Sequence, residues 1–186
     1  MKASLLLAVL ALAATARLGQ ANVLEVAQNV TDLSTLVLAV EAAGLAETIA
    51  NLTGPATLLA PTNEAFLTAL AQIEQATGLS ITGFEDIPEE TLVALLAYHV
   101  LPKQYSGAQL LALAPAVLDT YLTNATLVVG RADDTVVFQP SGGLAFANVT
   151  EADVAVPGTK VTVHVINNVL VPVEVLQELV AAQAAK

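Results

Sequence analysis

The sequence predicts an α+β fold, an antiparallel β-sandwich or wedge with a helical layer packed against it. The amino-terminal half carries apolar residues at helical spacing, whereas the carboxyl-terminal half carries short β-rich runs between turn residues. In addition, two widely separated strand candidates each end before a proline and lead into a helix. Together these patterns favour a sheet with helices on one side.

The amino-terminal half begins with two predicted helices. The first is capped by Thr31 or Asp32 and ends at Gly44, and its apolar stripe consists of Leu33, Leu36, Val37 and Val40. A short helix over 45–50 follows.

A strand and a helix are expected on either side of Pro61. Residues 57–60 form an apolar strand candidate, and Pro61 has no N–H group, so strand pairing should end there. Thr62 or Asn63 can cap the next helix, in which Phe66 begins an apolar stripe.

The helix that starts near Asn63 should end at Gly78. A loop then leads to Pro88, which opens another helix with leucines on its inner face. Tyr98 and His99 lie at the end of that helix.

The second half of the chain predicts one strand after another. Turn residues at Gly130, 140–143 and 157–158 separate β-rich runs, and the predicted strands are 127–129, 135–139, 144–149 and 161–165. In the last of these, valines alternate with Thr162 and His164, which is the period of a half-buried strand. Asn167 and Asn168 suit a turn or bulge, and a closing helix is expected over 174–185.

The first 21 residues have the pattern of a signal peptide. Lys2 precedes an apolar run over 5–14, and small residues allow cleavage after Ala16 or Ala21. The run is too short to span a bilayer, which takes about 20 apolar residues. We expect a signal peptide at 1–21, one domain at 22–181 and a short tail at 182–186, exported and without a lipid anchor.

The mature chain is strongly acidic. Loss of 1–21 removes two basic residues and no acidic one, so the formal net charge changes from −11 to about −13. The basic residues that remain are Lys103, Arg131, Lys160 and Lys186. They are too few to neutralise several phosphates, so nucleic acid and anionic lipid are not expected as partners. Basic partners or divalent cations are compatible with this charge.

Metal and thiol sites are not predicted. The acidic pairs at 85–86, 89–90 and 133–134 lack the spacing of an EF-hand loop, so we expect solvated surface there. The absence of cysteine excludes thiol chemistry and zinc–cysteine sites. We expect no cofactor and no metal.

Four Asn-X-Thr sequons occur, where a chain of this composition would carry about one by chance. The candidate N-glycosylation sites are Asn29, Asn51, Asn124 and Asn148. In a source without the glycosylation pathway, these would be ordinary turn and cap residues.

The two histidines are the candidates for a catalytic base. For His99, at a helix end, and His164, in a strand, we favour rings that bond to backbone groups. Ser106 and Ser141 lack a Gly-x-Ser-x-Gly elbow, and there is no glycine-rich phosphate loop. We therefore predict no catalytic residues and no enzymatic activity.

The runs 57–66 and 161–172 resemble the two signature motifs of the fasciclin domain family, and the Tyr98-His99-Val100 run between them is similar to that family's Tyr-His element. The resemblance extends from Asn22 to about Val180. Many members carry an aspartate where Asn167 or Asn168 stands, so this chain departs from the family there.

The resemblance implies two sets of functional residues. The candidate adhesive element consists of Tyr98, His99 and Tyr105, of which Tyr105 is the more exposed candidate, because a leucine-rich stripe at helical spacing is more often buried. The structural motif residues that hold the strand-to-helix corners are Thr57, Pro61, Thr62, Asn63, Phe66, His164, Asn168 and Pro172.

The resemblance implies a secreted, non-catalytic module for adhesion or for association with the extracellular matrix or cell wall. The expected partners are a cell-surface receptor, a matrix or wall component, or a second copy of the chain. Two alternatives remain open. A carrier of a small apolar ligand predicts an apolar cavity of several hundred Å³. A hydrolase of wall polymers predicts His99 or His164 in a cleft with a carboxylate and a hydroxyl.

Overall fold

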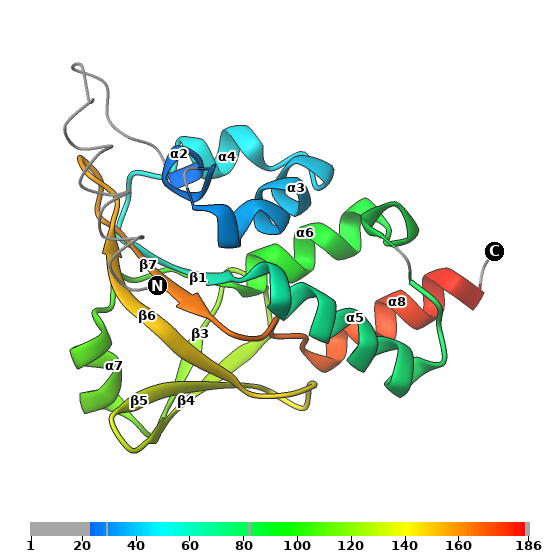
Figure 1. Cartoon of the computed structure of the whole chain (residues 1–186). Coiled ribbons are helices and arrows are strands. Elements are labelled where there is room, and N and C mark those ends of the chain that lie inside the picture. Colours follow the sequence, from blue (N-terminus) through cyan, green and yellow to red (C-terminus); the bar gives the residue numbers. More distant parts are fainter. Residues whose placement is uncertain (1–22, 29, 82, 185–186) are drawn as a thin grey trace.

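Seven strands form one sheet in the computed structural model, which describes residues 23–28, 30–81 and 83–184 (Figure 1). The order across the sheet is β2-β1-β7-β6-β5-β4-β3. The strands are β1 (Ala56–Pro61), β2 (Val100–Leu101), β3 (Ala116–Asp119), β4 (Thr126–Ala132), β5 (Thr135–Pro140), β6 (Ala147–Ala155) and β7 (Val161–Ile166). The N–H group of Tyr121, just after β3, donates to the carbonyl of Val100 in β2 at 2.9 Å, so the sheet is nearly closed into a barrel.

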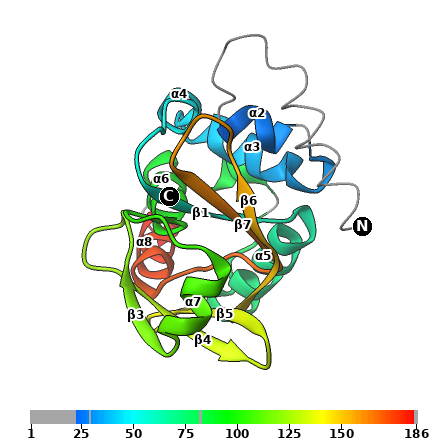
Figure 2. The same ribbon diagram turned by 90° about the vertical axis from the view of Figure 1, so that its left-hand side faces the viewer.

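Helices cover one side of this sheet, and the α+β class predicted from the sequence is confirmed. They are α2 (Val23–Gln28), α3 (Ser34–Ala42), α4 (Ala46–Ala50), α5 (Asn63–Thr77), α6 (Glu89–Tyr98) and α8 (Val173–Ala184), with 3-10 turns η1 (Thr31–Leu33) and η2 (Phe84–Asp86), whereas α7 (Gly107–Leu113) packs on the barrel side. Figure 2 shows β1, β7 and β6 between the helices α2 to α4 and the strands β3 to β5.

Strands β1 and β7 run parallel, with Ala56 opposite Val161 and Pro61 opposite Ile166. The other strand pairs of the sheet are antiparallel. The parallel pair was not expected from the sequence, because the two strands are far apart in the chain and no local turn sets their direction. As a result, the segments that follow both strands leave the sheet at the same end.

The β1–β7 pair separates two hydrophobic cores. On one face, Leu58 and Val163 belong to the core under the helices. On the other face, Leu59 and Ile166 belong to a core inside the barrel that includes Phe138. Strand β7 is therefore buried on both faces, and the expectation of a half-buried strand was wrong because a second core lies behind it.

The elements of the fold that were not predicted from the sequence include α7, β2 and β3. Helix α7 has a capping box, in which Ser106 accepts a hydrogen bond from the N–H group of Gln109 and the Gln109 side chain accepts one from the N–H group of Ser106. Ser106 and Gln109 have the Ser-x-x-Gln spacing of a capping box, so the start of this helix was predictable from the sequence. Leu110 of α7 is fully buried in the barrel core. Strands β2 and β3 are only 2 and 4 residues long, too short for a periodic pattern.

Strand β6 begins later and ends later than the predicted run 144–149. Its register against β7 shifts between Val149 and Glu151 and again between Glu151 and Val154. Asp153 has a φ of 61°, a left-handed conformation that few non-glycine residues adopt. These irregularities break the alternation on which the prediction depended.

Among the described residues, no helix is both long and apolar enough to cross a membrane. The predicted signal peptide lies outside these residues. Helix α8 continues to Ala184, so it includes residues 182–184 of the predicted tail.

Candidate functional site

The two corners anticipated from the sequence lie side by side. Because Pro61 pairs with Ile166, both strands stop at the same level of the sheet. The N–H group of Thr62 donates to the Ile166 carbonyl at 3.2 Å, and the Thr62 hydroxyl caps α5 by accepting from the N–H group of Ala65 at 3.3 Å. The first corner therefore joins the sheet directly to helix α5.

Asn63 joins α5 to η1 and to the first turn of α3. Its side-chain amide donates to the carbonyl of Thr31 at 2.9 Å, and its side-chain oxygen accepts from the N–H group of Thr35 at 2.8 Å. Phe66, one turn further, is buried and packs edge-to-face on Phe84 with ring centroids 5.7 Å apart. Both residues hold the helical layer together.

The second corner follows β7. The side-chain oxygen of Asn167 accepts from the N–H group of Asn148 at 2.8 Å, which extends the β6–β7 ladder by one side chain. The Asn168 amide donates to the carbonyl of Phe146 at 3.3 Å. Pro172 then precedes α8, and its carbonyl accepts the first helical bond from Leu176 at 3.2 Å.

Thr57 holds the loop after β2 against the sheet. Its side chain is fully buried, and its hydroxyl donates to the carbonyl of Lys103 at 2.8 Å while accepting from the N–H group of Tyr105 at 2.8 Å. One hydroxyl thus satisfies a backbone carbonyl and a backbone N–H group of the loop after β2, where the chain is not part of a strand.

His164 is fully buried and bonds to two backbone groups. The N–H group of Asp153 donates to Nδ1 at 3.2 Å, so the ring proton must be on Nε2, which donates to the Tyr105 carbonyl at 3.0 Å. Burial lowers the pKa of His164 below 6.5; the bond to Tyr105 and the charge of Asp153 act in the opposite direction. The ring ties β7 to β6 and to the loop that Thr57 also holds.

His99 is also buried, at the end of α6. The N–H group of Leu170 donates to Nε2 at 3.0 Å, so Nδ1 carries the proton and donates to the Leu95 carbonyl at 2.7 Å. Burial lowers the pKa of His99 to about 4, although the bond to Leu95 acts in the opposite direction. The ring therefore connects α6 to the loop before α8.

The aromatic members of the candidate adhesive element differ in exposure. Tyr98 is fully buried, and its hydroxyl donates to the carbonyl of Thr126 at 2.6 Å and accepts from the N–H group of Ser141 at 3.3 Å. Burial raises the pKa of Tyr98 to about 12. Tyr105 is half-buried, so it presents part of its ring to solvent.

The groups near the two histidines do not form the arrangement that a hydrolase of wall polymers needs. Both nitrogens of each ring bond to backbone groups, so neither ring faces a nucleophile. Beside His164, a carboxylate oxygen of Asp153 accepts from the N–H group of Gly107 at 2.9 Å, and the hydroxyl of Thr162 accepts from Gln104 at 3.0 Å. The hydrolase alternative therefore lacks its base at these positions.

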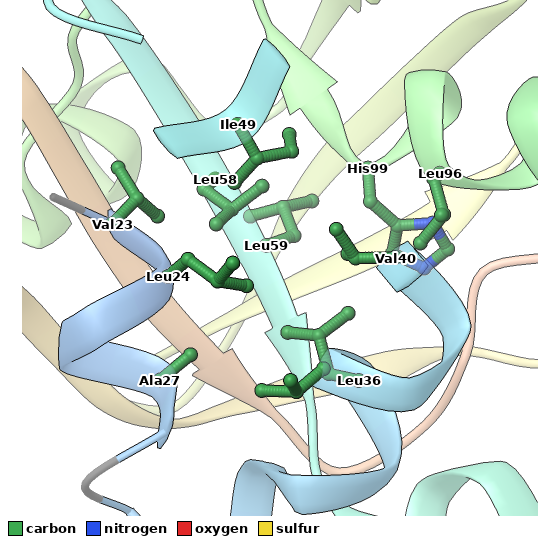
Figure 3. Close-up of a pocket in the computed structure, with 11 residues that line it drawn as sticks. Val23, Leu24, Ala27, Leu36, Val40, Ile49, Leu58, Leu59, Leu96 and His99 are labelled. Atoms are coloured by element: carbon green, nitrogen blue, oxygen red, sulfur yellow. The ribbon is translucent and has the colours of Figure 1, made fainter. Parts of the chain in front are cut away.

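The carrier alternative depends on a large internal cavity. The pocket between α2, α3, α4, α6 and β1 has a volume of only about 20 Å³, close to the room needed for one water molecule (Figure 3). Its lining is apolar apart from His99, and Leu58 and Leu36 point into it. A neighbouring pocket under α2 holds about 10 Å³. Neither can contain an organic ligand.

Three of the four sequon asparagines lie on the surface. Asn51 follows α4, Asn124 lies in the turn before β4, and Asn148 lies near the start of β6, and all three are exposed. Asn29 lies outside the described residues. The exposed sites belong to three separate parts of the fold.

Known proteins resemble this chain in sequence and in fold. The Fasciclin domain family matches residues 31–172. Protein sll1483 of Synechocystis sp. (strain ATCC 27184 / PCC 6803 / Kazusa) is 32% identical over 154 residues, which cover 81% of this chain and 73% of that protein.

Among solved structures, the fold is similar to a FAS1 domain pair from the insect cell adhesion molecule Fasciclin I, with a TM-score of 0.64 and 17% identity. The match covers 83% of this chain and 52% of the domain pair, so the chain spans about half of that protein's length. At this identity the likeness concerns the fold alone.

Proposed function

Because the chain belongs to the fasciclin domain family, we propose that it is a secreted, non-catalytic adhesion module that binds a cell-surface receptor, a component of the matrix or cell wall, or another copy of itself. The observation that carries this proposal is the family match over residues 31–172. The insect protein with a similar fold is named as a cell adhesion molecule, which supports the same assignment.

The bonding of the buried polar residues supports a scaffold interior. Thr57, His99 and His164 each bond to two backbone groups, and at least one of the two lies in a different part of the chain. A buried group used in this way contributes to the shape of the fold and is not free to act on a substrate. Recognition is therefore assigned to the exterior of the domain.

Within the candidate adhesive element, Tyr105 is assigned the direct contact. Tyr98 and His99 are buried, so they position the surrounding backbone, whereas part of Tyr105 faces solvent. Replacing Tyr105 with alanine should weaken adhesion, whereas the matched change at Tyr121, which is 54% exposed and lies outside the element, should not. Equal losses in both variants would remove Tyr105 from the binding surface.

Export to the cell exterior is supported by the sequence pattern of residues 1–21 and by the sequons. Glycans on Asn51, Asn124 and Asn148, which are exposed, would leave only part of the surface open to a partner. Asn29 would carry the fourth glycan. Replacing each asparagine with glutamine in turn tests this. A glycan mass that disappears from the secreted protein in one variant identifies the replaced asparagine as modified.

The test is a pull-down of the secreted protein against surface material of the cells that produce it, before and after enzymatic removal of glycans. We expect a partner to be recovered at low and moderate salt. The same protein unfolded by heat serves as the control for adsorption to the material. Recovery of no partner by the folded protein in either salt condition would overturn the adhesive assignment.

A further inference from the structure

An apolar groove lies between the carboxyl-terminal part of α5 and helix α8. The two helices contact each other (Figure 1). The groove is open to solvent and has a volume of about 390 Å³. It is lined by Ala76, Thr77, Leu176, Gln177, Val180 and Ala181. Val180 is 44% exposed, so it offers an apolar contact surface to an incoming group.

Among the described residues, the two helices that form this groove carry acidic side chains and no lysine or arginine. Helix α5 contributes Glu64 and Glu74, and α8 contributes Glu174 and Glu178. Glu74 on α5 and the two glutamates on α8 are exposed and belong to the helices that form the groove. In the described part of the chain, lysine and arginine occur only at Lys103, Arg131 and Lys160, outside these helices.

The helix ends add to this potential. The carboxyl end of a helix carries a partial negative charge, which a basic residue in the last turn commonly offsets. Neither α5 nor α8 has a basic residue in its last turn. Thr77, at the end of α5, lies in the groove itself. The groove therefore combines an apolar floor with a negative rim.

We propose that this groove binds a basic amphipathic helix of a partner protein. The apolar face of such a helix would pack on Val180 and Leu176, and its lysines or arginines would face the glutamates of α5 and α8. A second copy of this chain is a poorer occupant, because its own helical layer is equally acidic. The inference goes beyond the adhesion proposal, which assigns the direct contact to Tyr105, and it does not depend on that proposal.

The test uses purified protein and a labelled Leu–Lys peptide with leucines on one helical face, titrated by fluorescence anisotropy. We expect saturable binding that weakens with salt. Peptides with glutamate in place of lysine, or with the same residues in a non-amphipathic order, should bind at least about 10-fold more weakly. Equal binding of the non-amphipathic peptide would overturn the proposal, because it would show attraction by charge alone.

Two variants locate the site. Val180→Lys places a cation on the groove floor and should weaken binding about 10-fold. Leu67→Lys makes the same change at a residue of α5 that is 70% exposed and outside the groove lining, and should change binding less than about 3-fold. Equal losses would assign the binding to overall charge and overturn the site. Unchanged circular dichroism and melting curves show that both variants are folded.

Amide chemical shifts of isotope-labelled protein give a readout that is independent of affinity. On addition of the Leu–Lys peptide, the changes should concentrate at residues 76–77 and 176–181. Chemical shift changes centred elsewhere would overturn the proposal. Dimers that sedimentation detects without peptide, and whose interface the chemical shifts place in the groove, would also overturn it. The pull-down against cell-surface material is a separate measurement, so a failure of either experiment is distinguishable from a failure of the other.

Discussion

His99 and His164 are opposite tautomers with the same structural role. His99 carries its proton on Nδ1 and accepts from Leu170 on Nε2, whereas His164 carries its proton on Nε2 and accepts from Asp153 on Nδ1. Each ring needs one bare nitrogen, because each accepts a bond from a backbone N–H group. Both bridges therefore require a neutral imidazole.

This requirement predicts a stability that depends on pH. Burial lowers the pKa of His99 from 6.5 to about 4 and also lowers that of His164. The unfolded chain takes up these protons below about pH 6.5, and the folded chain takes up the His99 proton only near pH 4. The free energy of unfolding should therefore fall as the pH decreases from 6.5 toward 4, by roughly 3 kcal/mol for His99.

Urea denaturation at stepped pH measures this loss. In His99→Gln the side chain keeps a donor and an acceptor but does not titrate, so the variant should be less stable at neutral pH and lose less on acidification. If wild type and variant lose the same amount of stability between pH 6.5 and 4, other groups supply the dependence and His99 does not.

The buried hydroxyl of Thr57 should contribute measurably to stability. Thr57→Val keeps the shape of the side chain but leaves the Lys103 carbonyl and the Tyr105 N–H group without their partner. We expect a loss of about 1–3 kcal/mol in the free energy of unfolding. Thr57→Ser, which keeps the hydroxyl, is the matched control and should lose less. A valine variant as stable as the serine variant would contradict the role of this bond.

Gly143 is required by a close backbone approach at the end of the barrel. A Cβ atom at this position would lie 2.0 Å from the carbonyl oxygen of Val171, next to the bridge between Leu144 and Val171. Gly143→Ala should therefore cost about 2 kcal/mol or more in thermal or urea unfolding. Gly54→Ala is the control, because nothing lies within 4 Å of its Cβ position. Similar stability of the two variants would show that the approach is not tight.

The Phe66 side chain should affect stability without taking part in recognition. Phe66→Leu leaves a gap beside Phe84 and should lower the free energy of unfolding by about 1–2 kcal/mol. Adhesion measured well below the melting temperature should not change, because Phe66 is only 5% exposed. A Phe66→Leu variant with a normal melting curve but no adhesion would contradict this prediction.

The local features of both corners were predictable. Pro61 ends pairing, Thr62 caps α5 and Gly78 ends it with a φ of 72°, as their residue types require. The alternation of β7 also gave the correct faces, since its valines belong to one core and Ile166 to the other. Such features depend on residues within a few positions of one another, so a single segment is enough to specify them.

The sequence by itself therefore determined the α+β class, the positions of both corners and the family of this protein. Only the tertiary structure decided that β1 and β7 run parallel, that β7 is buried on both faces, and which groups the two histidines hold. His99 meets a residue 71 positions away and His164 one 59 positions away. Partners at such distances are set by how the whole chain closes and packs, and the residues next to each histidine in the sequence do not specify them.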